Sequence, residues 1–393
     1  MKFTVIGISD KEHPAFSPEI KEKIKEGSFF AGGERHLGLI KELLPDNYTW
    51  INVSVPLDNF FSTLQKQHDE WIIFASGDPL FFGIANTLRR HFPDSAIAVY
   101  PHFNSLQQLA HVLNFPYGMA RIVTLTGRPW AHFDKALLDN ECFMGILTDK
   151  NKTPASIASR MLEFGYDNYL IHVGEHMGGS KQHVRTLSLA EAASASFTMP
   201  NCLFLEQTHP RPQQQGIHDN EFNTLSGRPA MITKMPIRLA SLSLMGIKQR
   251  SVFWDIGACT GSISVEAKIM QPLLDVHSFE IRENSRELVM SNAKKFGTPI
   301  SFYQGDFLQT DVADLPLPDV VFLGGYGGNM HQILDKVSLY LKSTGIIGFN
   351  AVSIQSKDMF MQWGKENHFN LLDVSTIHVD TFNPVTIIII QKI

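Results

Sequence analysis

A glycine-punctuated turn between two apolar runs constrains this chain more than any other feature. Residues 251–261 read Ser-Val-Phe-Trp-Asp-Ile-Gly-Ala-Cys-Thr-Gly, and a second apolar run, Val-His-Ser-Phe-Glu, ends at Glu280. A strand that ends in a glycine turn, a following helix and a second strand that ends in an acid form the layout of a nucleoside-binding βαβ unit. Glycines allow a sharp turn and a close approach of the backbone to a ligand. The carboxylate of Glu280 is placed to accept hydrogen bonds from ribose hydroxyls.

The length and composition of the chain favour a protein with more than one domain. With 393 residues it is longer than a single hydrophobic core usually supports, so two or three domains are expected. Its 44% hydrophobic and 19% charged residues are ordinary for a globular protein. The formal net charge of −5 provides no overall electrostatic basis for nucleic-acid binding, but it is compatible with a local basic pocket for an anionic substrate.

Cysteine usage and hydropathy predict a cytoplasmic protein. Cys142, Cys202 and Cys259 are odd in number and widely spaced, which argues against a disulfide framework or a zinc site and fits a reducing compartment. The N-terminus reads as a first strand and lacks the long apolar core of a signal peptide. The apolar run at 386–390 is far too short to span a bilayer, so we expect no membrane partner.

Strand-like and helix-like segments alternate along both halves of the chain, which predicts an α/β fold class. In the first half, strands are expected at 3–8, 71–75, 96–100, 122–125, 143–147 and 169–173. In the second half they are expected at 252–256, 276–280, 300–304, 320–323, 345–350 and 386–391. The stretch 207–228 is rich in Pro, Gln, His and Asn and has little apolar periodicity. It is therefore the expected linker between domains 1–206 and 229–393.

Further features of the second half follow the ends of its expected strands. The first turn contains Asp255, Gly257, Ala258, Thr260 and Gly261 but lacks the central glycine of a standard G-x-G-x-x-G, so a generic strand-to-helix turn is the alternative. Gly305 and Asp306 follow the third strand, where a carboxylate can accept a hydrogen bond from an adenine amino group. Gly324 follows the fourth strand, at the edge where ligands collect in doubly wound sheets.

This ordered set resembles class I S-adenosylmethionine-dependent methyltransferases rather than NAD dehydrogenases. The closing segment 381–393 reads as the hairpin arm that this class carries after its last helix. The segment Thr233-Lys234-Met235-Pro236-Ile237-Arg238 looks like the Met-Thr-Lys-x-Glu-Val-Arg segment of the CbiT family of cobalamin biosynthesis, and Cys259 stands where that family has glycine. The resemblance implies that Thr233 and the turn and strand-end residues named above bind the cofactor.

Two turns mark the first half of the chain. Gly7 follows the apolar residues of the first strand, and Ser76-Gly77-Asp78-Pro79 follows the strand at 71–75. By itself the second turn is a tight strand-to-helix connection with free backbone groups. Together with Gly-Gly-Glu-Arg-His, which contains Arg35 and His36, and with Ser105, it resembles the tetrapyrrole methylases, and their CbiE branch in particular. That resemblance implies a class III methyltransferase fold of two α/β lobes, with Gly7, Ser76, Gly77, Asp78, Pro79 and Ser105 at the cofactor.

In this order the two resemblances match the fused precorrin-6Y methyltransferases (decarboxylating) of cobalamin biosynthesis. The match implies an N-terminal tetrapyrrole methylase domain and a C-terminal class I Rossmann-like methyltransferase domain, each with one S-adenosylmethionine site. It implies methylation of precorrin-6B, or its cobalt form, at carbons 5 and 15 with loss of carbon dioxide from the ring C acetate, giving precorrin-8 or its cobalt form. The first domain would serve carbon 5, and the second would serve carbon 15 and the decarboxylation.

Four residues are candidates for contact with such a substrate. Methyl transfer from a sulfonium to an electron-rich carbon needs alignment, exclusion of water and charge stabilisation, so no nucleophilic serine or cysteine is required. Decarboxylation benefits from a cation beside the carboxylates, and Lys234 and Arg238 are the candidates, with a solvated surface charge as the alternative for each. Arg35 and His36 are expected to contact the tetrapyrrole or a neighbouring loop rather than to take part in catalysis. Among the 16 histidines, His172 and His176 are four residues apart, but no second cluster offers compatible ligands. We therefore expect no metal site.

Three other functions stay open at this stage. The first is an RNA or protein methyltransferase with an accessory N-terminal domain, although the acidic balance and the lack of basic clusters argue against RNA. At 323–326, moreover, Leu-Gly-Gly-Tyr replaces an Asn/Asp-Pro-Pro-Tyr type of motif. The second is a non-enzymatic tetrapyrrole carrier, and the third is an NAD oxidoreductase. By analogy with relatives of both domains, we expect a homo-oligomer.

Overall fold

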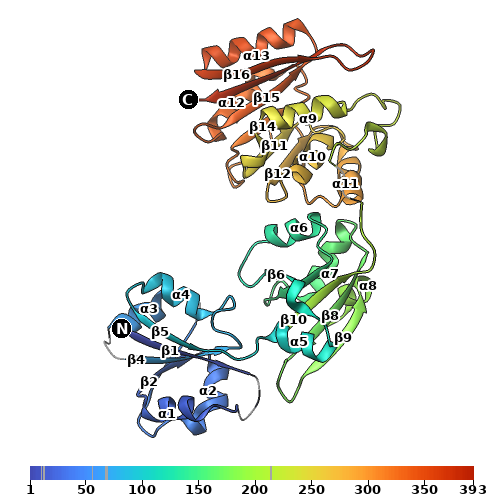
Figure 1. The fold of residues 1–393 in the computed structure, drawn as a ribbon. Helices are drawn as coiled ribbons and strands as arrows, with labels where there is room; N and C mark the ends of the chain where they lie inside the picture. The colour runs from blue at the N-terminus through green and yellow to red at the C-terminus, as the bar shows by residue number, and fades with distance from the viewer. Residues whose placement is uncertain (10, 12–13, 55, 67–69, 213–214) are drawn as a thin grey trace. The chain divides into compact units, whose positions relative to one another are not determined.

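The computed structural model describes residues 1–9, 11, 14–54, 56–66, 70–212 and 215–393 (Figure 1). The chain divides into two compact units, and each is described by itself. The first contains Met1–Arg128, Cys142–Ser159 and Tyr169–Thr208, and the second contains Pro129–Glu141, Arg160–Asn168 and His209–Ile393. A helix that spans a bilayer needs about 20 apolar residues, and the helices within the described ranges are all too short or too polar for that role.

The first lobe of the first unit is a five-stranded parallel sheet in the order β3-β2-β4-β1-β5. Its strands are β1 (Lys2–Ile8), β2 (Phe29–Gly32), β3 (Thr49–Asn52), β4 (Glu70–Ser76) and β5 (Ala96–Tyr100), and its helices are α1 (Pro18–Glu26), α2 (Glu34–Ile40), α3 (Asp58–Gln65) and α4 (Ile84–His91). Val5 and Ile73 pack with α3 and α4, whereas Ile6 and Phe74 pack on the other face with α1 and α2. Burial on both faces explains the uninterrupted apolar runs of β1 and β4.

The second lobe is a five-stranded mixed sheet in the order β6-β7-β10-β8-β9, in which β10 runs antiparallel to both β7 and β8. Its strands are β6 (Arg121–Thr124), β7 (Phe143–Leu147), β8 (Tyr169–Glu175), β9 (His183–Ser188) and β10 (Asn201–Gln207). Its helices are α5 (Ser105–Leu113) and α8 (Leu189–Ser194). Helix α7 (Pro154–Glu163) begins in this unit and ends in the second, and α6 (Ala131–Leu138) belongs to the second unit. Helix α5 packs on β10, where Leu109 and Phe204 belong to one apolar cluster.

The second unit is built around a seven-stranded sheet in the order β13-β12-β11-β14-β15-β17-β16. The strands are β11 (Val252–Ile256), β12 (Asp275–Glu280), β13 (Ser301–Gln304), β14 (Val320–Leu323), β15 (Ile346–Ala351), β16 (Phe369–Ile377) and β17 (Val385–Lys392). The first five strands in the sheet order are parallel, and β17 pairs antiparallel with β15 and β16. This is the doubly wound arrangement that the sequence predicts.

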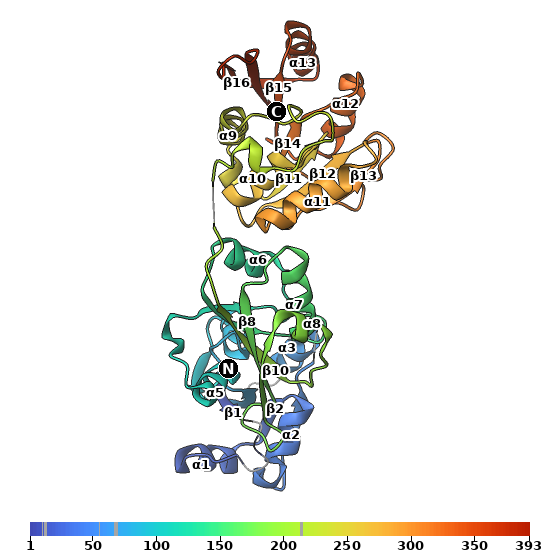
Figure 2. The ribbon, with the colours of Figure 1, turned by 90° about the vertical axis from the view of Figure 1, so that its right-hand side faces the viewer.

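Helices cover both faces of this sheet (Figure 2). They are α9 (Met235–Leu244), α10 (Ser262–Met270), α11 (Ser285–Phe296), α12 (Met330–Tyr340) and α13 (Ile354–Glu366). Across both units, the described residues also include four short 3₁₀ turns, at Lys41–Leu43, Tyr117–Met119, Asp219–Glu221 and Ile247–Gln249. Trp254 of β11 packs on the side of α12 and α13, and its neighbour Phe253 packs on the side of α9 and α10. Successive residues of one strand thus supply both cores.

The C-terminal arm differs from its expected form. The sequence predicts the hairpin within 381–393, whereas the hairpin pairs β17 with β16, so that residues 381–384 belong to its turn. The apolar pattern of β16 is irregular because Leu371 and Leu372 are adjacent and both exposed, and a bulge between Leu371 and Asp373 shifts the register. Without a period-two pattern, the sequence has no strand signal there.

Residues 216–223, which the sequence places in the linker 207–228, are packed onto the second unit. Ile217 and Phe222 are buried in the cluster that includes α9 and α10, and Asn223 N donates to the Asn292 Oδ1 atom at 2.8 Å. Two other residues of the predicted linker, Gln213 and Gln214, lie outside the described residues. An apolar pair five residues apart matches neither helix nor strand periodicity, so the sequence pattern contains no signal of this burial.

Candidate functional site

A cavity of about 430 Å³ lies between the two lobes of the first unit. Residues that follow β1, β2 and β4 line it, together with the first turn of α5 and residues of β8 and β10. Its volume lies within the usual range for ligand pockets. Four predicted residues, Arg35, His36, Ser76 and Ser105, line this cavity. The structure thus brings them together at the carboxyl ends of parallel strands, where α/β sheets bind ligands.

The other predicted cofactor residues of the first half, Gly7, Gly77, Asp78 and Pro79, shape the strand ends beside this cavity without lining it. A Cβ atom on Gly7 would lie 2.0 Å from the Gly77 carbonyl oxygen, so only glycine lets the ends of β1 and β4 approach this closely. Gly77 has a φ of +62°, in the left-handed region. Asp78 Oδ1 accepts a hydrogen bond from the backbone N–H two residues later at 2.8 Å, which stabilises the turn.

Arg35, His36 and Ser76 form a hydrogen-bonded cluster on the cavity wall. Arg35 Nη2 donates to Ser76 Oγ at 2.7 Å, and His36 Nε2 lies 3.0 Å from the same oxygen. His36 Nδ1 accepts from the Gly33 backbone N–H at 3.1 Å, so the neutral ring carries its proton on Nε2 and donates to Ser76. Burial and then the charge of Arg35 lower the pKa of His36 to about 4, which keeps the ring neutral at pH 7.

Ser105, the first residue of α5, lies at the cavity beside a buried thiol. Asn104 caps the helix, because its Oδ1 atom accepts from the Gln107 backbone N–H at 2.9 Å. Burial raises the pKa of the Cys202 thiol to about 12, with a smaller opposing effect from its hydrogen bond to Ser105. The thiol therefore stays protonated, which makes it a poor nucleophile.

A second cavity, of about 450 Å³, lies in the second unit at the ends of β11 and β14. The predicted residues that line it are Thr233, Lys234, Asp255, Gly257, Ala258, Thr260 and Gly324. A Cβ atom on Gly257 would lie 2.4 Å from the Gly325 backbone nitrogen, so the two strand ends also approach through glycine. Cys259 has a φ of +52°, which is the left-handed conformation that glycine adopts without strain. Gly261, at +74°, begins α10 and does not line the cavity.

Asp255, at the end of β11, is a buried carboxyl group on the wall of the second cavity. The Ser264 hydroxyl donates to its Oδ2 atom at 2.5 Å, whereas Oδ1 has no hydrogen-bond partner among the described residues. Burial raises the pKa of Asp255 to about 7, and the hydrogen bond from Ser264 opposes that shift. A buried oxygen without a donor is the kind of atom that a bound cation or N–H group satisfies.

Glu280, Gly305 and Asp306 stand beside this cavity without lining it. Glu280 Oε2 accepts from the Cys259 backbone N–H at 2.8 Å and from Arg282 Nη1 at 3.0 Å. Arg282, rather than Glu280, lines the cavity. Asp306 Oδ1 accepts from the backbone N–H two residues later at 2.9 Å, and Gly305 N donates to the Glu280 carbonyl oxygen at 3.0 Å. The three residues are therefore adjacent at the ends of β12 and β13.

The predicted catalytic residue Lys234 precedes α9 and lines the second cavity. Its Nζ atom lies 3.5 Å from Asp219 Oδ2 and 4.5 Å from the centre of the Phe382 ring, which lines the same cavity. Its side chain is partly exposed. This position allows the ammonium group to contact a ligand in the cavity.

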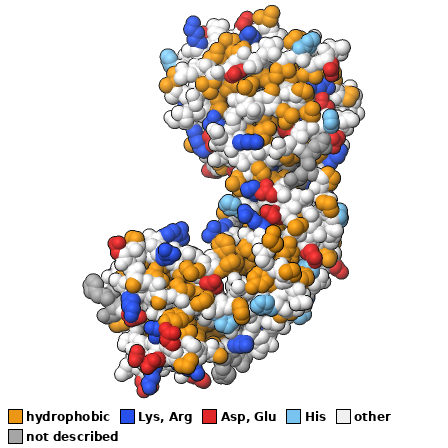
Figure 3. Space-filling view, viewed as in Figure 1, with side chains coloured by type: hydrophobic (Ala, Val, Ile, Leu, Met, Phe, Trp, Pro, Cys, Tyr) orange, Lys and Arg blue, Asp and Glu red, His pale blue; other side chains and the backbone are white. Residues whose placement is uncertain are grey.

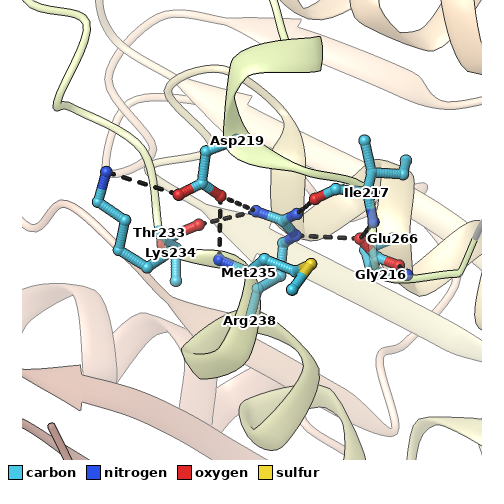
Figure 4. Close-up of polar contacts among 8 residues, drawn as sticks. All are labelled: Gly216, Ile217, Asp219, Thr233, Lys234, Met235, Arg238 and Glu266. Carbon is cyan, nitrogen blue, oxygen red and sulfur yellow. Dashed lines mark hydrogen bonds and ion pairs between the residues drawn. The ribbon is translucent and has the colours of Figure 1, made fainter. Parts of the chain in front are cut away.

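The other predicted catalytic residue, Arg238, has a side chain that is fully buried (Figure 4). Its Nε atom pairs with Glu266 Oε2 at 3.1 Å, and Nη1 pairs with Asp219 Oδ1 at 3.4 Å. It also donates to the carbonyl oxygens of Thr233 at 2.8 Å and Ile217 at 2.5 Å. The structure therefore separates Lys234, which lines the cavity, from Arg238, which is enclosed by protein acceptors.

Sequence reasoning missed several residues that line the cavities. They are Phe81, Gln108 and Asn201 in the first cavity, and Arg282, Gly325 and Phe382 in the second. Phe82 has a φ of +54°, which is uncommon for a bulky residue and marks a strained turn. Phe382 reaches the cavity from the hairpin turn, and no sequence spacing relates it to Lys234. Within the described ranges, no group of three or more His, Cys, Asp and Glu side chains could hold a metal ion.

Two protein families match the two halves of the chain. The tetrapyrrole (corrin/porphyrin) methylases match residues 4–193, and the precorrin methyltransferase domain matches residues 227–387. The first match covers the two lobes around the first cavity except β10, and the second covers most of the sheet that forms the second cavity. They confirm the predicted order of a tetrapyrrole methylase fold followed by a class I Rossmann-like methyltransferase fold.

Individual relatives align with the whole chain or with one half of it. The precorrin-6Y C(5,15)-methyltransferase (decarboxylating) of Sinorhizobium sp is 27% identical over 385 residues, which cover 96% of this chain and 90% of the relative. The cobalt-precorrin-7 C(5)-methyltransferase of Salmonella typhimurium is 24% identical over 205 residues, or 52% of this chain and 98% of the relative.

The probable cobalt-precorrin-6B C(15)-methyltransferase (decarboxylating) of Pyrobaculum calidifontis is 33% identical over 144 residues, or 36% of this chain and 72% of the relative. The relative named for both reactions thus covers nearly the whole chain, whereas each single-activity relative covers only a part of it. The chain belongs to the family of fused, decarboxylating precorrin-6Y C(5,15)-methyltransferases.

Proposed function

We propose that this chain methylates a precorrin-type tetrapyrrole at carbons 5 and 15 and decarboxylates it, with S-adenosylmethionine as the methyl donor, in cobalamin biosynthesis. The order of matches along one chain carries the proposal. The tetrapyrrole methylase match comes first along the chain and the precorrin methyltransferase match second. The chain also aligns with 98% of a carbon-5 methyltransferase and with 72% of a decarboxylating carbon-15 methyltransferase. A relative named for both reactions aligns with 96% of the chain. The first cavity then serves carbon 5, and the second serves carbon 15 and the decarboxylation.

Each domain is proposed to bind one S-adenosylmethionine, which supplies an electrophilic methyl group when it is bound. In the second cavity, the partnerless Oδ1 atom of Asp255 supports this because it can accept a hydrogen bond from the cofactor's ammonium group. A Cβ atom on Gly325 would meet open space, so a ligand can lie against the backbone there. These residues would hold the cofactor, while Glu280 and Asp306 keep their predicted ribose and adenine roles as part of the proposal.

In the first cavity, Ser76 is proposed to contact the bound ligands directly. Its oxygen accepts from Arg35 and His36, so its own hydroxyl proton is available to an acceptor on a ligand. The neutral His36 and the cationic Arg35 place one positive charge at this wall, which suits a carboxylated macrocycle. Phe81 and Phe82 supply apolar surface in the same cavity, against which a flat ring can pack.

For the decarboxylation, Lys234 is the proposed catalytic cation. The acetate carboxylate leaves as carbon dioxide: its carbon–carbon bond breaks, the electron pair of that bond passes into the conjugated ring, and a proton is then taken up in place of the carboxylate. The carboxylate must first lose its hydration and lie with that bond aligned to the ring. An ammonium group on the wall of a cavity can orient a substrate carboxylate through a charge-assisted hydrogen bond. Arg238 is fully buried, so we propose that it supports this wall from behind and does not touch the substrate.

The distribution of surface charge favours the macrocycle over a nucleic acid as the substrate. On the visible face of the molecule, acidic and basic side chains are scattered rather than gathered by sign (Figure 3). A nucleic-acid substrate would favour a continuous basic surface, so this distribution supports the tetrapyrrole over RNA. A homo-oligomeric state and a cytoplasmic location belong to the same proposal, by analogy with relatives and from the cysteine pattern.

Mass spectrometry of the products tests this function. The protein is incubated with S-adenosylmethionine and precorrin-6B, in metal-free and in cobalt forms. A gain of two methyl groups with loss of carbon dioxide is expected for the natural form of the substrate, and the comparison identifies that form. An unchanged mass with both forms, despite cofactor binding to both halves, would contradict the assignment and point to an RNA or protein acceptor.

A further inference from the structure

The segment Gly216–Asp219 lies outside the matched precorrin methyltransferase domain, which begins at residue 227, yet buried groups bind it to that domain. Glu266, whose side chain is fully buried on α10, accepts from the backbone N–H groups of Gly216 at 2.7 Å and Ile217 at 3.3 Å. The carbonyl oxygen of Ile217 accepts from Arg238 Nη2 at 2.5 Å. A buried carboxylate and a buried guanidinium thus fix both polar groups of Ile217, so this segment has a defined position.

Asp219 ends this segment at the N-terminus of α9 (Figure 4). Its Oδ1 atom accepts from the Met235 backbone N–H at 3.0 Å and from Arg238 Nη1 at 3.4 Å. Its Oδ2 atom lies 3.5 Å from Lys234 Nζ. One carboxylate therefore contacts three donors from the first residues of α9, where the helix dipole also favours a negative charge. Because Arg238 is anchored by Glu266, the Asp219 carboxylate is held from the buried side and presents its second oxygen to Lys234.

The charges of this group balance. Arg238 and Lys234 are cations, and Glu266 and Asp219 are anions, with Asp219 between the two cations. Without the charge of Asp219, the Lys234 ammonium would face Arg238 as a like charge and would lose its ionic partner. A lysine side chain that is not held samples many rotamers, most of which do not direct its ammonium group to one place. Asp219 on one side and the Phe382 ring on the other hold Lys234 at the cavity wall.

We propose that Asp219 is a positioning residue for the carbon-15 methylation and decarboxylation, and that it acts by holding the Lys234 ammonium group where the substrate carboxylate binds. The inference rests on the proposed role of Lys234 as the cation of that reaction. It extends the active second domain to a segment that precedes the matched family domain. In this proposal, the buried Arg238 and Glu266 hold Asp219 in place from the inside of the domain.

The substitution Asp219→Asn in the full chain tests the inference. Asparagine keeps an oxygen that can accept from Met235 N and Arg238, but it removes the charge that pairs with Lys234. With precorrin-6B and S-adenosylmethionine, we expect kcat/KM for carbon dioxide release to fall about two- to fivefold, as for the loss of a partly exposed ion pair. Methylation at carbon 5 and the S-adenosylmethionine affinity of the second domain should stay unchanged. Glu221→Gln, which removes a charge from the same 3₁₀ turn, is the matched control.

The double variant Asp219→Asn with Lys234→Met separates positioning from folding. If Asp219 acts through Lys234, the asparagine substitution has no further effect once the lysine is methionine. A normal Asp219→Asn enzyme beside an impaired Lys234→Met enzyme would overturn the positioning role and leave the proposed function intact. A normal Lys234→Met enzyme would remove the role of Lys234 itself, and this inference with it. Equal losses in carbon dioxide release, carbon-5 methylation and cofactor affinity would show that Asp219 is only structural.

Discussion

Lys234 and Arg238 are one helical turn apart, but they have opposite environments. The Lys234 side chain is partly exposed at the second cavity, whereas that of Arg238 is fully buried and surrounded by acceptors. The sequence treats them alike, because both are cations in one short segment. Only the packing of residues 216–219 over α9 decides that Lys234 faces the cavity and that Arg238 is enclosed by protein acceptors.

Substitution of each cation by methionine should therefore fail in a different way. Lys234→Met is expected to lower carbon dioxide release about tenfold or more, the factor that corresponds to roughly 1.4 kcal/mol of lost substrate interaction, with little change in unfolding. Arg238→Met should lower the free energy of unfolding by about 3–5 kcal/mol, because Glu266 stays buried without its partner. Urea unfolding and product analysis of both variants check this contrast. Equal stability of the two variants would contradict the assigned environments.

The titration of His36 predicts a pH dependence of stability. Burial and the charge of Arg35 lower the pKa of His36 to about 4 in the folded protein, below the ordinary value of 6.5. A depressed folded-state pKa means that the unfolded chain binds the proton more readily. The stability that comes from the neutral His36 ring is thus fully present above pH 6.5 and is lost as the pH falls toward 4. His36→Asn should flatten the stability profile between pH 6.5 and 4, as followed by thermal unfolding; an unchanged slope would exclude His36 as its source.

At the scale of elements, helix α12 fixes the loop that carries Asp306. Lys336 Nζ donates to three carbonyl oxygens of that loop, those of Phe307 at 2.7 Å, Leu308 at 3.3 Å and Thr310 at 2.6 Å. One ammonium group thus provides a hydrogen-bond donor to three carbonyl oxygens of a turn that has no regular secondary structure. Since the loop follows β13 directly, its conformation sets the place of the proposed adenine contact.

Lys336→Met should loosen this loop. Three carbonyl oxygens would lose their donor, so we expect a loss of about 1–3 kcal/mol in unfolding free energy and weaker S-adenosylmethionine binding to the second domain. Lys336→Arg, which keeps several N–H donors, is the comparison variant. Calorimetric titration of the cofactor measures the effect, and equal affinities for the methionine and arginine variants would argue against a role of Lys336 in shaping the site.

The sequence predicted elements well where burial imposes a simple period. Strands β7, β11 and β14 occupy the predicted residues, because buried strands read as continuous apolar runs. Strand β5 also occupies its predicted residues, although its side chains are exposed or partly buried. It missed β3, β9 and β16, whose residues are mostly exposed or partly buried, and it also missed β10, whose central residues are buried. For such strands, pairing with a neighbour decides the structure rather than the local sequence, and hydrogen-bonded partners far along the chain are not visible in a periodicity.

At the scale of the whole molecule, the start of the second domain differs from the start of the matched family domain. Residues 216–223 contribute Ile217 and Phe222 to its core and Asp219 to the network around Arg238. We expect a fragment of residues 209–393 to bind S-adenosylmethionine and to unfold cooperatively. A fragment of residues 229–393 should be less stable by several kcal/mol, because two large apolar side chains and two partners of Arg238 are removed. Comparison of their thermal midpoints and cofactor affinities tests this boundary, and equal midpoints would refute it.

The sequence by itself determined the two-domain order, the α/β class, the glycine turns and the family. These follow from local patterns: Gly7, Gly77 and Gly257 stand where neighbouring backbones leave no room for a Cβ atom, so the residue type reports the geometry directly. The tertiary structure alone decided that Arg238 is enclosed, that Asp219 reaches Lys234, and that Phe382 and Arg282 line the second cavity. Side chains from distant segments meet there by packing, and no spacing along a chain encodes which of two nearby charges becomes buried.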